Sequence, residues 1–126
     1  MLSHTNLLWD APRTWVCVLL SLVFLIMGAR ACLAPLGFSR FFGIAVSEGD
    51  AVYVRVAGAR DIAMSAMGAA FILMDLRIPF AILIFASAIV AALDGFIGWV
   101  NGGPGVGAKH VFGAVLLSVL GFWTLH

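Results

Sequence analysis

The chain has 126 residues, of which 63% are hydrophobic and 10% are charged, and its mean hydropathy is +1.14. A soluble domain of this size cannot bury such an excess of apolar surface, because soluble domains average about 45–50% apolar and about 25% charged residues. The formal net charge of +1 leaves no basic face for a nucleic acid. These values predict an integral, multi-pass membrane protein whose first partner is the lipid bilayer.

Four apolar segments divide the chain and predict one transmembrane domain over residues 1–126. We expect an all-α bundle of four transmembrane helices with short loops. At about 20 apolar residues per span, the predicted spans are residues 15–33, 52–74, 79–100 and 109–125. Trp9 and Trp15 are expected at the membrane interface. The first span is expected to be retained and not cleaved as a signal, because no basic segment precedes it.

The connections between the spans differ in composition. Residues 37–50 (GFSRFFGIAVSEGD) indicate a loop at the interface, with phenylalanines that dip into the acyl region. Residues 75–77 (DLR) indicate a tight turn. Residues 101–108 (NGGPGVGA) indicate a Gly/Pro loop. That loop leaves a short last helix, which is expected to begin at Lys109 or His110.

Charged residues inside the spans are the main functional signal. The second and third helices form an antiparallel hairpin around Leu76, so residues equally far from Leu76 lie at similar depth. The position that mirrors Asp94 is Gly58, so Arg60 and Asp61 lie within about one helical turn of Asp94 in depth. An unpaired charge at mid-bilayer costs about 2.5–3.5 kcal/mol. We therefore predict that Arg60, Asp61 and Asp94, the charged trio, are catalytic residues that pair or face water.

Further charges gather on the same side of the membrane. The end of the first helix and the start of the last bring Arg30, Lys109 and His110 towards Arg55, and we predict that Arg30, Arg55 and His110 bind substrate. Two carboxylates would then face three arginines, and the surplus cation would attract an anionic or carbonyl-bearing ligand. The half beside residues 75–77 is expected to be apolar. Snorkelling of the arginines to head groups, an interfacial His110 and a purely structural ion-pair network are the alternatives.

Small residues on two spans predict close helix packing and association of copies into a homo-oligomer. The stripes are Ala59, Ala63, Ala66 and Ala70 on the second helix, and Ala91, Gly95 and Gly98 on the third. Cys17 and Cys32 fall on one helix, about 22 Å apart along its axis. That separation excludes a disulfide between them, because bridged cysteines have Cα atoms within about 7 Å.

A pattern that begins in residues 34–70 and is completed by Asp94 resembles that of a known family. Its parts are 34–35 (AP), 41–44 (FFGI), 58–61 (GARD) and the later Asp94. The pattern resembles that of a family of small four-helix membrane proteins of unknown function, found in fungi and bacteria, with an intramembrane Gly-x-Arg-Asp motif. The resemblance covers most of the chain and implies the four-helix fold and the importance of the charged trio. Fungal members are expected beside natural-product biosynthetic genes, which favours a lipophilic small-molecule substrate.

Two functions from different classes fit these features. The first is a membrane-embedded isomerase, cyclase or similar acid/base catalyst that acts on a lipophilic small-molecule intermediate in natural-product biosynthesis. A carboxyl group desolvated between helices can act as general acid or base, so Asp94 or Asp61 would move the proton and Arg60 would stabilise an oxyanion. The alternative is a non-catalytic membrane accessory or scaffold subunit. A transporter would need a polar path through both halves of the bundle. No metal and no cofactor are expected, because metal-binding and phosphate-binding motifs are absent from the sequence.

Overall fold

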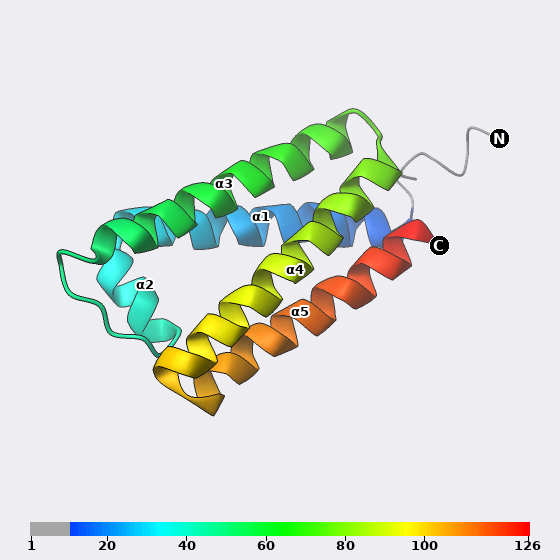
Figure 1. Cartoon of the computed structure of the whole chain (residues 1–126). Helices are drawn as coiled ribbons and strands as arrows, with labels where there is room; N and C mark the ends of the chain where they lie inside the picture. Colours follow the sequence, from blue (N-terminus) through cyan, green and yellow to red (C-terminus); the bar gives the residue numbers. More distant parts are fainter. Residues whose placement is uncertain (1–10) are drawn as a thin grey trace.

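The computed structural model describes residues 11–126, which form helices with no strand among them (Figure 1). The helices are α1 (Pro12–Leu33), α2 (Pro35–Phe41), α3 (Ala51–Leu73), α4 (Arg77–Gly102) and α5 (Pro104–Leu125). Four of these helices in the described range, all except α2, are long and apolar enough to cross a membrane. The all-α, four-span class predicted from hydropathy is therefore confirmed. The predicted interfacial position of Trp9 lies outside the described residues.

The four long helices are arranged as two pairs. α1 packs mainly along α3 and α4 mainly along α5, whereas α3 and α4 contact each other much less. The α1/α3 pair and the α4/α5 pair lie close together beside the α3–α4 turn and the C-terminus, and they diverge towards α2 (Figure 1). α2 descends from the end of α1 towards the α4–α5 connection, so it links the two pairs at their separated ends.

Glycines set the close approach of α1 to α3. A Cβ atom added at Gly58 would lie 2.7 Å from the carbonyl oxygen of Gly28, so the two backbones touch at this crossing. Such small-residue contacts stabilise helix pairs where lipid removes the hydrophobic driving force. The predicted alanine stripe on this helix is not the packing face, because Ala59, Ala63, Ala66 and Ala70 are all exposed. The buried residues of α3 are instead Ala51, Gly58, Asp61, Ser65, Gly68 and Ile72.

α4 packs against α5 through glycines of the small-residue stripe that the sequence predicts on α4. Gly95 and Gly98 are buried, and a Cβ added at Gly95 would lie 3.1 Å from the Cβ of His110. From the other side, a Cβ added at Gly107 would lie 3.2 Å from the carbonyl oxygen of Gly95. Gly107 therefore serves helix contact and not loop flexibility.

Two connections differ from the predicted ones. α2 occupies the first part of the expected loop at residues 37–50, and Pro35 suits its first turn because proline presets a helical φ. The expected loop at residues 101–108 is wrong, since a single residue, Gly103, separates α4 from α5. Gly103 has φ 87°, which glycine adopts without strain, and Pro104 begins the next helix at once. α5 therefore has 22 residues, and the short last helix is also wrong.

The half of the bundle near the α3–α4 turn is not apolar, contrary to expectation. Its buried polar side chains include Thr14, Ser65, Ser87 and Thr124. Ser65 donates its hydroxyl to the backbone carbonyl of Ser21 at 2.7 Å, so it bonds across the α1/α3 pair. Ser87 and Thr124 donate to carbonyls in their own helices at 2.8 Å. Hydroxyls satisfied in this way are tolerated inside a membrane bundle.

Candidate functional site

The charged trio begins with an ion pair between the two helix pairs. Arg60 on α3 donates from its Nη2 to Oδ2 of Asp94 on α4 at 3.0 Å. Along the helix axes, Arg60 is about 13 Å from Ala51 and Asp94 is about 12 Å from Gly102. Both residues therefore lie in the interior of their spans and at a common depth. The depth argument from the antiparallel hairpin correctly brought these two residues together.

Asp61 completes the trio from the packed side of α3. Its Oδ1 lies 3.5 Å from Nε of Arg60. Asp61 is buried on the same stripe as Gly58 and Ser65, which contact α1. The side chains of neighbouring residues project about 100° apart on a helix. Arg60 therefore reaches towards α4 while Asp61 faces α1, and one guanidinium serves two carboxylates.

The three side chains differ in exposure. The side chain of Asp61 is 10% exposed, whereas those of Arg60 and Asp94 are 39% and 32% exposed. A charge that faces lipid in the interior of a span is costly, so such groups usually turn to protein or to water. The exposed edge of this ion pair is consequently the part of the trio that a bound molecule can reach.

The predicted substrate-binding arginines lie elsewhere. Arg55 donates from Nε to the carbonyl oxygen of Cys32 at 3.3 Å, so it partners one of the carbonyls that the end of α1 leaves unpaired. Arg30 is exposed in the last turn of α1, where a cation suits the helix dipole. The expected surplus of cations at the trio is therefore wrong. Arg60 is the only one of the three arginines paired with Asp61 or Asp94 within residues 11–126, and the surplus charge is negative.

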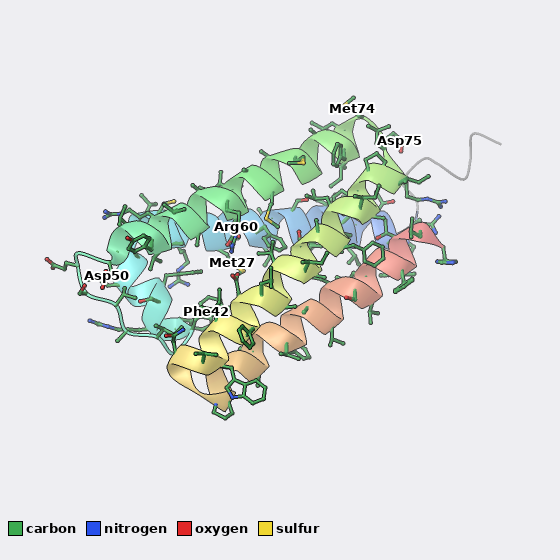
Figure 2. All side chains as sticks on the ribbon, viewed as in Figure 1. Met27, Phe42, Asp50, Arg60, Met74 and Asp75 are labelled. Carbon is green, nitrogen blue, oxygen red and sulfur yellow. The ribbon has the colours of Figure 1, made fainter. Side chains whose placement is uncertain are left out.

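His110 lies on α5, the helix that packs along α4. Its Cβ abuts the backbone at Gly95, the residue that follows Asp94. The His110 ring stacks on Phe42, with ring centroids 5.3 Å apart and an angle of 22° between the planes. Figure 2 shows Phe42, Met27 and Arg60 along the region between the α1/α3 pair and α4.

The position of Phe42 differs from the one that the sequence predicts. The phenylalanines of residues 37–50 are expected to dip into the acyl region, but Phe42 turns inward onto α5. Phe38 packs on Phe42, with ring centroids 4.9 Å apart. Lys109 holds the same segment by donating from Nζ to the carbonyl oxygen of Phe41 at 3.1 Å. The positive φ of Gly43, 86°, reverses the chain directly after Phe42. The Phe-Phe-Gly run was the available signal, since glycine after an aromatic pair permits this sharp turn.

A small cavity lies on the other side of the trio, towards the α3–α4 turn. Its volume is about 20 Å³, and the hydroxyl-bearing residues Ser21, Ser65 and Ser87 contribute to its lining. A space of about 10–15 Å³ or more with polar partners can hold one water molecule. The cavity is too small for an organic ligand.

Fold and site together define a small, multi-pass helical membrane protein with a charged trio inside the bundle. The chain belongs to the family described as Domain of unknown function (DUF4267), whose match extends over residues 21–124. That match includes the whole charged trio and all of α3 and α4. No curated protein and no solved structure matches the chain.

Proposed function

We propose that this protein is a membrane-embedded catalyst that performs acid/base chemistry on a lipophilic small molecule. The observation that carries the proposal is the Arg60–Asp94 ion pair, which joins the two helix pairs yet keeps about a third of each side chain exposed. A purely structural pair would be enclosed, because exposure to lipid gives it no compensating contact. A ligand with a polar group and an apolar body would cover this edge.

The trio divides into roles that suit an isomerase or cyclase. Asp94 abstracts a proton from a carbon beside a carbonyl, and Arg60 stabilises the oxyanion that develops on the carbonyl oxygen. Return of the same proton to a different carbon completes an isomerisation without an oxidant or reductant. Asp61, buried behind Arg60, holds the guanidinium in position. The excess of carboxylate over cation supports a proton acceptor in this role.

A lipophilic substrate follows from where the site lies. The two helix pairs diverge on the α2 side of the trio (Figure 1), and their outer surfaces are apolar. A molecule dissolved in the bilayer can approach from the side, and the stacked rings of Phe42 and His110 offer it an aromatic wall. Natural-product biosynthesis is the metabolic setting we propose for such a substrate.

The test uses the gene in its native host. The chromosomal copy is replaced by wild type, by Asp94→Asn, by Arg60→Ala, or by a deletion, and lipid-soluble metabolites are compared by mass spectrometry. Asp75→Asn is the matched control, since Asp75 is a carboxyl in the α3–α4 turn (Figure 2). We expect both trio variants to reproduce the deletion profile, Asp94→Asn at a normal protein level, and the control to resemble wild type. A deletion profile identical to wild type, or trio variants with wild-type profiles, would overturn the proposal.

The second candidate is a non-catalytic accessory subunit or scaffold. The exposed alanine stripe of α3 favours it, because small side chains on a lipid-facing surface permit close docking of another helix. The same alanine face of α3 would form the contact between copies of the chain in a homo-oligomer. Ala63→Leu is expected to reduce association, measured by light scattering of the purified protein in detergent, while Ala92→Leu on the exposed face of α4 leaves it unchanged. A monomeric wild type in detergent and in nanodiscs would contradict self-association.

A further inference from the structure

An open groove of about 480 Å³ lies at the end of the bundle that carries α2. Its lining includes Leu33, Pro35, Leu36, Glu48, Ala51 and Arg55. Small-molecule sites commonly have volumes of about 300–1,000 Å³. This α2-end groove contains no residue of the charged trio, so it is separate from the site described above.

Two helix ends form walls of the α2-end groove, which indicates that the groove lies at the level of the lipid head groups. α1 ends at Leu33, one wall of the groove, and α3 begins at Ala51, another. Helix ends and the loops that join them meet the polar region of a bilayer, whereas the apolar helix interiors cross the hydrocarbon core. The side chain of Leu33 is exposed and gives the groove an apolar edge.

Arg55 is held at the groove by one edge of its guanidinium. Nε donates to the carbonyl oxygen of Cys32 at 3.3 Å, and Sγ of Cys32 donates to the carbonyl oxygen of Arg55 at 3.6 Å. Within residues 11–126, the terminal nitrogens of Arg55 make no hydrogen bond or ion pair. A guanidinium fixed in this way presents two donors to an anion, and phosphate matches that geometry.

Glu48 places a negative charge in the same groove. It forms no ion pair with Arg55 or with any other residue in the described part of the chain. The groove thus carries a cation and an anion that are not satisfied by each other. Its best complement is a ligand with a phosphate and a nearby cationic donor.

We propose that the α2-end groove binds the head group of a phospholipid that carries both a phosphate and a primary ammonium, as phosphatidylethanolamine does. Arg55 donates to the phosphate and Glu48 accepts from the ammonium. A quaternary ammonium has no N–H to donate to Glu48, and a glycerol head group donates only from neutral hydroxyls, so it carries no cation to pair with the carboxylate of Glu48. The apolar walls at Leu33 and Leu36 contact the start of the acyl chains.

The experiment measures lipid retention by native mass spectrometry. The purified protein is incubated with phosphatidylethanolamine, phosphatidylcholine and phosphatidylglycerol of identical acyl chains. We expect the wild type to retain the ethanolamine lipid most firmly. Glu48→Gln should lower retention of that lipid about tenfold, to the level of the choline lipid, since a charged hydrogen bond is lost. Arg55→Gln should lower retention of all three, because each carries a phosphate.

Arg40→Gln is the matched control, an exposed cation on α2 that does not line the groove. Arg55→Gln also removes the hydrogen bond to the carbonyl oxygen of Cys32 at the end of α1. Arg55→Lys, which keeps the positive charge, is therefore measured beside it. If both fail to fold, Glu48→Gln in the exposed loop still tests the proposal. Preferential retention of phosphatidylglycerol, equal retention of all three lipids, or an unchanged ethanolamine preference in Glu48→Gln would overturn it.

Discussion

Replacing the two partners of the Arg60–Asp94 ion pair should have unequal effects on stability. Arg60→Met removes the cation that serves both Asp61 and Asp94, and it leaves two carboxylates unpaired inside the span. Asp94→Asn leaves Arg60 still paired with Asp61. Removal of the arginine is therefore expected to destabilise the fold much more than removal of the aspartate.

The magnitudes follow from the distance and the exposure of the pair. Unit charges separated by 3.0 Å attract by about 5.5 kcal/mol at an effective dielectric constant of about 20. Desolvation and exposure reduce the net coupling, and we expect about 2 kcal/mol. An unpaired charge inside a span costs about 2.5–3.5 kcal/mol. Asp61 bears this cost because its side chain is 10% exposed, whereas Asp94, at 32%, is partly relieved of it, so Arg60→Met should cost about 3 kcal/mol. Asp94→Asn should cost about 1 kcal/mol, and the double variant about 2 kcal/mol.

The assay is equilibrium unfolding in mixed micelles of a mild detergent and SDS, followed by tryptophan fluorescence. Two single variants of equal effect, or a strictly additive double variant, would refute the reasoning.

Two further predictions concern packing and orientation. Gly58→Ala would place a Cβ 2.7 Å from the carbonyl oxygen of Gly28 and should lower the free energy of unfolding by about 1–3 kcal/mol in the same assay. The control Gly113→Ala, with no atom within 4 Å of its new Cβ, should raise it by up to about 1 kcal/mol. Equal effects of the two variants would argue against a close crossing of α1 and α3. The α2 end carries most of the lysines and arginines, so it should face the cytoplasm. Without the native cysteines, a cysteine at Ser47 should react with an impermeant maleimide only after permeabilisation, and one at Met74 in intact cells; reversed labelling would contradict this orientation.

The depth of the charged residues in the membrane could be predicted from the sequence, but the direction in which each side chain points could not. Counting residues from Leu76 correctly brought Arg60 to the level of Asp94, because every helical residue advances by the same rise. The same count placed Arg55 on the same side of the membrane. It could not show that Arg55 turns to the end of α1. The sign of the surplus charge was therefore predicted wrongly.

The structural role of each glycine was ambiguous from the sequence in the same way. The run at residues 101–108 has the composition of a loop, yet only Gly103 forms the turn, and Gly107 lies against α4. Glycine permits both a positive φ and a close helix contact. Which of these a glycine serves depends on the neighbouring helix, so sequence position alone does not separate them.

The sequence by itself determined the membrane class, the number of spans and the depth of the charged residues. Those properties depend on local hydropathy and on a constant rise per residue, and neither requires knowledge of a neighbour. Only the tertiary structure decided that α1 pairs with α3 and α4 with α5, that alanines of α3 face outward, and that one arginine serves two aspartates. Successive side chains turn by about 100° around a helix, and the face that meets a partner is selected by packing between whole helices.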